Sequence, residues 1–256
     1  MARTIRGKVV VITGASSGIG RATAEILARE KAKLVLVARR EELLNEVPAE
    51  LRLALDLRQT DQVETMIQRT LAELGRIDVL INNAAFGYYG SVEKTPLPVV
   101  REIFNLNFEA PLLASQRVIP IMRAQGGGHI INVSSVAGKR GLPMAGIYCA
   151  TKFALNGISE SLRVELKGSG IDVSIINPAA TQTEFGDNVR TGDVTGKFKA
   201  MGHVQSAEEV AEAIVRCIRH PKIEVYPYGV SRLLAWANAV WPSAVDKIMA
   251  RFFHHK

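Results

Sequence analysis

The sequence of 256 residues is poor in cysteine and in aromatic side chains: it has two cysteines, Cys149 and Cys217, and 6% Phe, Trp and Tyr. Two cysteines cannot form the disulfide framework of a small secreted protein, so we expect a reducing compartment and a cytoplasmic location. A nucleic-acid surface would need basic side chains interleaved with aromatic ones. The low aromatic content therefore predicts that nucleic acid is not a partner, although the net charge is +7.

Long hydrophobic runs are also missing. A transmembrane helix needs ~20 consecutive apolar residues, and the longest candidate, 233–241, has about half of that length. The apolar run behind the basic N-terminus, 9–12, is too short for the hydrophobic core of a signal peptide. With 47% hydrophobic and 22% charged residues, the chain can fold around a core. The sequence predicts a soluble protein with one domain over residues 1–256.

Short apolar, β-branched runs alternate along the chain with longer segments of helical periodicity. The runs occupy residues 8–13, 33–38, 51–55, 77–82, 129–134, 172–177 and 222–226. The clearest helical patterns lie at 19–31, 62–74 and 207–219. A continuous apolar run such as 9–12 indicates a strand buried on both faces, as parallel sheets require. This alternation predicts a doubly wound α/β sheet with right-handed crossovers.

Two regions break this rhythm. Residues 179–205 are rich in Thr, Gly and Lys without a clear strand pattern, and loops of this length are usually functional lids or disordered. We interpret them as a substrate-binding loop region. Residues 227–256 form an apolar, helix-compatible tail. The tail is expected to form a lipophilic entrance, a dimer contact or a membrane-surface contact, or simply to pack against the core.

Three glycines follow the first predicted strand and open a predicted helix. Gly14, Gly18 and Gly20 have the spacing Gly-x-x-x-Gly-x-Gly. Glycines at such a turn let the backbone approach a pyrophosphate, which then binds the amide groups of the helix N-terminus. A tight packing turn would have the same composition, so the glycines alone favour a nucleotide site without establishing one.

Two arginines stand where NAD-selective folds usually place an acid. The second predicted strand ends at Ala38 and is followed by Arg39 and Arg40. Guanidinium groups bind a 2′-phosphate, whereas an acid would repel it. NADP(H) is therefore the favoured cofactor, with NAD(H) as the alternative, and Arg39 is preferred over Arg40. A solvated arginine pair is the competing interpretation. Residues 1–40 hold nine basic and two acidic side chains, so this unit carries the whole net charge.

Tyr148 and Lys152 are four residues apart, so on a helix they share one face. An ammonium group one turn away favours the phenolate and is expected to lower the pKa of Tyr148 towards the operating pH. Ser135, at the end of the fifth predicted strand, offers a hydroxyl to a substrate carbonyl. Each residue alone has an ordinary structural explanation. Their joint occurrence after the glycine turn favours catalysis.

Together these motifs resemble the short-chain dehydrogenases/reductases. The motifs are Thr13-Gly-x-x-x-Gly-x-Gly20, Asn82-Asn-Ala-Ala85, Ser135 and Tyr148-x-x-x-Lys152. The resemblance covers roughly residues 5–225 and implies a Rossmann fold with a seven-stranded, mostly parallel sheet in the order 3-2-1-4-5-6-7 and helices on both faces. It also implies hydride transfer between a nicotinamide and a carbonyl or secondary alcohol.

The resemblance carries over further site residues. Asn107 matches a fourth catalytic position beside Ser135, Tyr148 and Lys152, with Asn105 as its competitor. No metal is implied. The expected cofactor contacts are Gly14, Ser16, Ser17, Gly18, Ile19, Gly20, Arg39, Arg40, Asp56, Leu57, Asn83, Ala84, Tyr148, Lys152, Pro178, Thr181 and Thr183. Ala85 and Ala179 replace glycines of the family pattern, which is tolerable where φ is negative.

The predicted substrate is a small molecule with a hydrophobic body. Apolar side chains fill the segments expected to form the pocket, namely Phe86, Tyr88, Tyr89, Leu142, Met144 and Phe185. The apolar tail also resembles that of family members acting on steroid-, retinoid- or lipid-like carbonyls, which implies a substrate of this kind. The competing interpretation is that the pocket side chains pack against one another. The resemblance also implies a homodimer or homotetramer built on helices around 96–123 and 147–167.

Overall fold

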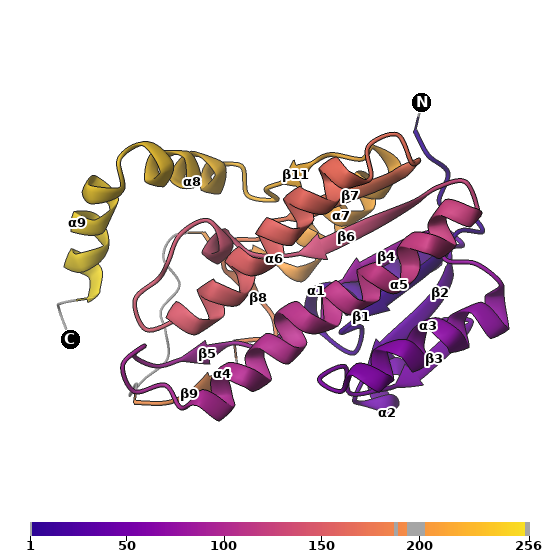
Figure 1. Cartoon of the computed structure of the whole chain (residues 1–256), viewed down its shortest axis with the longest axis horizontal. Helices are drawn as coiled ribbons and strands as arrows, with labels where there is room; N and C mark the ends of the chain where they lie inside the picture. The colour runs from indigo at the N-terminus through magenta and orange to yellow at the C-terminus, as the bar shows by residue number, and fades with distance from the viewer. Residues whose placement is uncertain (1, 187–188, 194–202, 254–256) are drawn as a thin grey trace.

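A seven-stranded sheet forms the centre of the computed structural model, which describes residues 2–186, 189–193 and 203–253 (Figure 1). The sheet order is β11-β7-β6-β4-β1-β2-β3, and every pairing in it is parallel. Numbered by their sequence order within this sheet, the strands run 3-2-1-4-5-6-7, so the predicted doubly wound Rossmann fold is confirmed. The strands are β1 Val9–Thr13, β2 Lys33–Ala38, β3 Leu51–Ala54, β4 Val79–Asn82, β6 Gly128–Val133, β7 Ile171–Ile176 and β11 Glu224–Val225.

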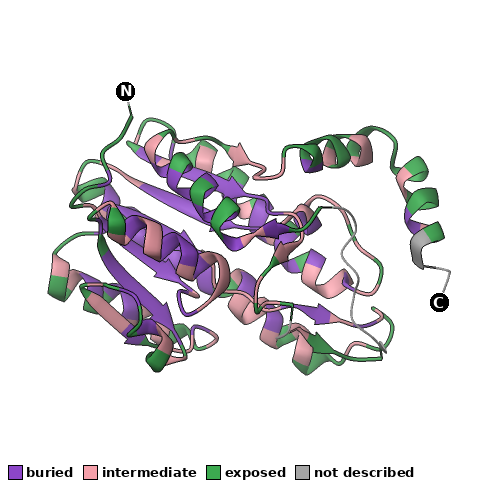
Figure 2. Cartoon of the chain, turned by 180° about the vertical axis from the view of Figure 1, so that it is seen from behind, coloured by how far each residue is buried: buried purple, intermediate pink, exposed green. Residues whose placement is uncertain are grey.

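Helices cover both faces of the sheet, which appears as a buried layer between them in Figure 2. Along β1, Val10 and Ile12 join one core cluster and Val9 and Val11 join the other. The first cluster includes side chains of α1 (Gly18–Arg29), α2 (Glu41–Leu44) and α7 (Ala207–Arg219). The second includes side chains of α3 (Thr60–Leu74) and α5 (Ala110–Ala124), with α6 (Gly146–Glu165) packed against it. Burial on both faces explains why the first four residues of β1, Val9 to Ile12, are all apolar.

Two small sheets were not expected from the sequence. β5 (Tyr88–Tyr89) pairs with β9 (Arg190–Thr191), and β8 (Thr181–Gln182) pairs with β10 (Gln205–Ser206). The region expected to have no clear strand therefore contains β8, β9 and the first residue of β10. Each of these strands is two residues long and is stabilised by pairing with another segment. Positions 187–188 and 194–202 of the predicted substrate loop lie outside the described residues.

The C-terminal tail forms α8 (Val230–Val240) and α9 (Pro242–Phe253), which extend beyond the sheet next to β11 (Figure 1). Asn238 accepts a hydrogen bond from Arg140 and donates one to Lys139 O, and Arg140 also pairs with Asp246. The large apolar side chains of α8 and its end are mostly exposed: Leu233, Leu234, Trp236, Val240 and Trp241. Packing against the core, one of the expected roles, does not hold for these five.

Residue 1, residues 254–256 and the side chains of Phe252 and Phe253 lie outside the described part of the chain. None of the helices in the described ranges has the length and apolar character to cross a membrane.

Candidate functional site

The predicted site residues gather at the carboxyl edge of the sheet. Gly14 follows β1, Arg39 follows β2, Asn83 follows β4, Ser135 lies two residues beyond β6 and Pro178 two beyond β7. In a parallel sheet the carboxyl ends of neighbouring strands share one edge, where open α/β folds bind their ligands. Segments separated by up to 164 positions of sequence are brought together in this way.

The glycine turn after β1 has the backbone that a nucleotide loop needs. Gly14 and Gly18 have φ values of +67° and +54°, a region that favours glycine. A Cβ on Gly20 would clash with the carbonyl oxygen of Gly14, so the third glycine lets α1 begin close against the turn. Ala85 and Ala179, which replace family glycines, do not have positive φ. The two extra methyl groups therefore add no backbone strain.

Thr13 holds this turn to the end of β4, a role that the sequence analysis missed. Its Oγ1 accepts hydrogen bonds from the backbone N–H groups of Asn83 and Ala84, at 2.9 and 3.0 Å. In return, Asn83 Nδ2 donates to the carbonyl oxygens of Thr13 (2.9 Å) and Gly14 (3.2 Å). Asn83 therefore fixes the glycine turn.

The two arginines after β2 have different surroundings. Arg39 is exposed and makes no hydrogen bond or ion pair with another described residue, while its charge contributes to a lowered pKa of Asp56. Arg40 reaches back to the glycine turn, where Nη2 donates to Ser16 Oγ at 3.2 Å. Its Nη1 pairs with Glu184 Oε2 at 2.9 Å. Both guanidinium groups thus border the predicted nucleotide site.

Ser135, Tyr148 and Lys152 form one cluster. Ser135 caps a short 3-10 turn, η2 (Val136–Gly138), and accepts a hydrogen bond from Ala137 N at 3.1 Å. It also hydrogen bonds to the Tyr148 phenol. Lys152 Nζ lies 5.8 Å from the centroid of the Tyr148 ring and donates to Val133 O at 2.9 Å. Lys152 is only 3% exposed, so the ammonium group is held inside the protein.

The expected lowering of the Tyr148 pKa was wrong for this structure. Burial raises the pKa of Tyr148 well above its ordinary value, and the hydrogen bond with Ser135 lowers it by less. Burial also lowers the pKa of Lys152 to about 8. Desolvation disfavours the charged form of each group and outweighs the neighbouring ammonium that the spacing suggested. Tyr148 therefore carries its proton at neutral pH.

Asn107 lies in a single π-helical turn, η1 (Asn105–Glu109), between α4 (Leu97–Phe104) and α5. Its side chain is 1% exposed, accepts from Phe86 N at 3.1 Å and donates to Phe86 O at 3.0 Å. Nδ2 also approaches Thr151 Oγ1 at 3.2 Å, on the helix that carries Tyr148 and Lys152. Such π-helical turns are common at functional sites. Asn105, the competing position, is only partly buried.

The segment after β7 joins the cluster through several contacts. Pro178 O accepts from Val136 N at 3.0 Å, next to Ser135, and Thr181 Oγ1 donates to Ala179 O. Thr183 lies against Gly18 so closely that a Cβ there would come within 3.0 Å of the threonine Cβ. Gln205, which was not predicted, accepts from Ala179 N at 3.0 Å.

Two predicted cofactor contacts contribute to the core as well. Ile19 packs against the cluster that contains α1 and α7, and Leu57 is 7% exposed in the opposite cluster. Ser17 is the residue before α1, with extended backbone and no side-chain cap hydrogen bond, so its hydroxyl remains available at the helix N-terminus.

An ion-pair network that the sequence analysis missed runs beside Asp56, one of the predicted cofactor contacts. Arg58 pairs with both Asp56 and Glu102, and Glu102 pairs in turn with Arg190 of β9. The hydrogen bonds from Arg58 are the main reason that the pKa of Asp56 is lowered. The Arg190 guanidinium lies 4.9 Å from the centroid of the Phe86 ring. The network links the segment after β3 to β9, which lies within the predicted substrate loop.

The predicted pocket segments lie around Tyr148. The Phe185 ring centroid is 5.7 Å from that of Tyr148. Tyr89 and Leu142 pack with Tyr148 against a small buried cluster, as the competing interpretation of mutual packing suggested. Tyr88 is only 5% exposed, so it is a structural residue in this arrangement.

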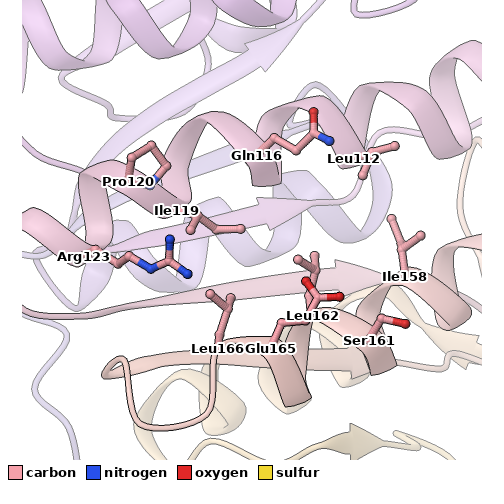
Figure 3. Close-up of a pocket in the computed structure, with 10 residues that line it drawn as sticks. All are labelled: Leu112, Gln116, Ile119, Pro120, Arg123, Ile158, Ser161, Leu162, Glu165 and Leu166. Carbon is pink, nitrogen blue, oxygen red and sulfur yellow. The ribbon is translucent and has the colours of Figure 1, made fainter.

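A separate groove lies between α5 and α6 and contains none of the predicted site residues (Figure 3). Its walls are lined by Leu112, Gln116, Ile119, Pro120, Arg123, Ile158, Ser161, Leu162, Glu165 and Leu166.

Comparison with known proteins agrees with this arrangement. Residues 8–193 match the sequence profile of a family described as short chain dehydrogenase. A Danio rerio protein named dehydrogenase/reductase SDR family member 7B is 32% identical over 265 residues, which is 96% of this chain and 85% of the relative. A short chain dehydrogenase/reductase from Burkholderia phymatum, solved with NAD, has a TM-score of 0.83 and 27% identity over 93% of this chain and 94% of that one. L-sorbose reductase from Gluconobacter frateurii, solved with NADPH and L-sorbose, has a TM-score of 0.77 and 29% identity over 88% and 97% of the two chains.

Proposed function

The chain belongs to the short-chain dehydrogenase/reductase family, and on this basis we propose that it transfers hydride between NADP(H) and a carbonyl or secondary alcohol of a hydrophobic small molecule. One observation carries the proposal. Ser135 hydrogen bonds to the Tyr148 phenol while the buried ammonium of Lys152 lies 5.8 Å from the centroid of the same ring. A phenol, a hydroxyl and a cation held together at the carboxyl edge of the sheet suit proton transfer to a substrate oxygen.

The residues at this edge fit a dinucleotide. The positive φ values of Gly14 and Gly18 and the close approach at Gly20 provide a turn that can receive a pyrophosphate on backbone amides. The bound cofactor would supply the hydride. The residues proposed to hold it are Gly14, Ser16, Ser17, Gly18, Ile19, Gly20, Arg39, Arg40, Asp56, Leu57, Asn83, Ala84, Tyr148, Lys152, Pro178, Thr181 and Thr183.

The preference for NADP(H) rests on the residues after β2. Solved relatives are bound to NAD in one case and to NADPH in the other, so family membership does not decide between them. In this chain Ala38 ends β2, and Arg39 is exposed without an ion-pair partner in the described residues. A guanidinium without an ion-pair partner favours a 2′-phosphate over a bare ribose.

A Tyr148 phenol that carries its proton at neutral pH suits carbonyl reduction. Because the phenol keeps its proton at neutral pH, Tyr148 Oη can give that proton to the carbonyl oxygen as the carbonyl carbon accepts the hydride. Ser135 donates a hydrogen bond to the same oxygen and stabilises the charge that develops there. Lys152 supplies a nearby positive charge. Asn107 holds Phe86 and Thr151 in place beside this group, and so supports both the pocket and α6.

A hydrophobic substrate is supported by the side chains near Tyr148. Phe185, Tyr89 and Leu142 contact or pack beside it, and none brings a charge. Loss of NADPH absorbance at 340 nm with a panel of steroid, retinoid, fatty-aldehyde and sugar carbonyls tests the proposal. Turnover of apolar carbonyls supports it. A chain that binds NADPH but reduces none of them would be a nucleotide-binding module, which contradicts the proposal.

The proposal extends to partners and location. The exposed apolar side chains of α8 suit contact with a membrane surface, and the partly apolar groove between α5 and α6 suits a homodimer or homotetramer (Figure 3). The free thiols of Cys149 and Cys217 are both buried, which fits a protein of the reducing cytoplasm. Sedimentation of the purified chain would give its oligomeric state.

A further inference from the structure

Arg40 forms an ion pair with a carboxylate of the same chain. Its Nη1 is 2.9 Å from Glu184 Oε2, and its Nη2 donates to Ser16 Oγ in the glycine turn. Glu184 lies 144 positions away in the sequence, in the predicted substrate loop. The Glu184 carboxylate is therefore already paired with one of the two arginines that would bind the 2′-phosphate of the cofactor.

The residues on either side of Glu184 contact the other two parts of the site. Thr183 lies against Gly18 of the glycine turn, and Phe185 packs on the ring of Tyr148. The backbone is turned between them, because Gly186 N donates to Thr183 O and Phe185 N to Thr183 Oγ1. A movement of Glu184 away from Arg40 would therefore shift a segment that touches the catalytic tyrosine.

We infer that Glu184 competes with the 2′-phosphate of NADP(H) for Arg40, and so modulates the preference for NADP(H) and holds residues 183–186 in position. The inference rests on the proposed function. The Glu184 and Arg40 side chains are 51% and 39% exposed, and ion pairs at such exposed sites are weak. A phosphate carries more charge than a carboxylate and has three acceptor oxygens, so it displaces Glu184. NADH has no 2′-phosphate and leaves the pair intact.

Binding measured for NADPH and NADH separately tests the competition. Glu184→Gln removes the competing charge and keeps the side-chain size, so NADPH should bind about fivefold more tightly, as expected for loss of an exposed ion pair. The affinity for NADH should stay within about twofold. Glu212→Gln is the matched control, because Glu212 is also exposed and pairs only with Arg216 on α7. With Arg40→Ala already present, Glu184→Gln should no longer tighten NADPH binding.

Amide hydrogen exchange without any nucleotide tests the second half of the inference. If Glu184 holds the segment, exchange of amides 183–186 should be several-fold faster in Glu184→Gln than in the wild-type chain, with the Glu212→Gln control unchanged. Saturating NADPH should leave this exchange faster than saturating NADH does in the wild-type chain, because both nucleotides contact Thr183 but only NADPH displaces Glu184 from Arg40.

The outcomes separate this inference from the proposed function. A wild-type chain that prefers NADPH but shows the same NADPH-to-NADH ratio in Glu184→Gln overturns the role of Glu184 alone. The role of Glu184 is also overturned if Glu184→Gln binds NADPH and NADH more tightly by the same factor, or if amide exchange at 183–186 is unchanged in this variant. A wild-type chain that binds neither nucleotide, or prefers NADH, overturns the inference together with the cofactor assignment.

Discussion

Lys152 Nζ lies 5.8 Å from the centroid of the Tyr148 ring and donates its hydrogen bond to Val133 O, 2.9 Å away. The two side chains share a face of α6, as their spacing requires, but burial acts on both. It raises the pKa of the phenol and lowers that of the ammonium to about 8. The Tyr148 phenol is therefore protonated at neutral pH, as the proposed carbonyl reduction requires.

Removing the Tyr148 hydroxyl should abolish most turnover. Tyr148→Phe keeps the ring that packs on Phe185 but loses the proton donor, and general acid catalysis is worth about 10²–10⁴ in rate. NADPH affinity, measured by fluorescence, should change little. Tyr226→Phe is the control, since its hydroxyl bonds to Glu224 rather than to the cluster. Retained turnover in Tyr148→Phe would exclude this residue as the proton donor.

The lowered pKa of Lys152 predicts a limit on activity at high pH. The ammonium loses its proton as the pH rises through about 8, so kcat/KM for reduction should fall above that pH. Lys152→Arg keeps the charge to much higher pH, so this fall should move upward even where the absolute rate is reduced. Lys139→Arg, at a partly exposed lysine paired with Glu224, should leave the profile in place. If kcat/KM falls at the same pH in Lys152→Arg as in the wild-type chain, the fall is caused by the titration of another group.

The sequence was sufficient to predict the alternating strands and helices and the glycine turn that directly follows β1. The sequence predicts β1 as a buried strand because residues 9–12 are apolar without interruption, and the glycine turn follows Thr13 directly. Seven such runs in alternation with helices determine the sheet, and the carboxyl-edge rule then places Ser135 near Tyr148. These predictions need only periodicity, turn chemistry and the handedness of parallel crossovers.

Other features depend on contacts that no local pattern encodes. β9 exists because Arg190 and Thr191 pair with β5, about a hundred positions earlier. The pairing of Arg40 with Glu184 likewise joins a strand end to a loop. The direction of the Tyr148 pKa shift could not be derived from spacing, because it is the balance between desolvation and charge in the folded site.

Arg39 should be the main determinant of cofactor preference. Arg39→Asp places an acid after β2, where it repels a 2′-phosphate and can accept from a ribose hydroxyl. The dissociation constant for NADPH should rise at least about tenfold, and the preference should shift towards NADH. Arg69→Asp, on the exposed side of α3, controls for the change in net charge. An unchanged NADPH-to-NADH ratio would contradict the role of Arg39.

His129 should make the fold sensitive to mild acid. Burial lowers the pKa of His129 to about 4, with Asp172 opposing the shift and Arg3 adding to it. The unfolded chain titrates near ~6.5. The folded-state pKa is the lower one, so this contribution to stability is complete above pH ~6.5 and is lost as the pH falls through 4.

Between pH 7 and pH 5 the loss amounts to about 2 kcal/mol of unfolding free energy. Urea unfolding at the two pH values measures it. His129→Gln should lose most of this pH dependence, whereas His220→Gln, at an exposed position on the end of α7, should retain it. If the unfolding free energy changed equally with pH in His129→Gln and in the wild-type chain, a buried neutral imidazole at this position would be excluded.

The exposed side of α8 should bind anionic membranes if the tail contacts a lipid surface. Leu233 and Leu234 are 66% and 67% exposed, the ring centroids of Trp236 and Trp241 lie 5.9 Å apart, and Arg232 adds a positive charge. Tryptophan and cations beside an apolar stripe are typical of helices that lie in the membrane interface.

Replacing both leucines by Gln removes apolar area worth about 3 kcal/mol or more on burial, so binding to phosphatidylserine-containing vesicles should weaken more than tenfold. Leu97→Gln on α4 is the matched control, because Leu97 is also 67% exposed. Vesicles of neutral phosphatidylcholine should bind the wild-type chain less, since the cations then have no partner. If the double variant keeps its vesicle binding but sediments as a smaller species, the stripe is a contact between copies of the chain and the membrane role is wrong.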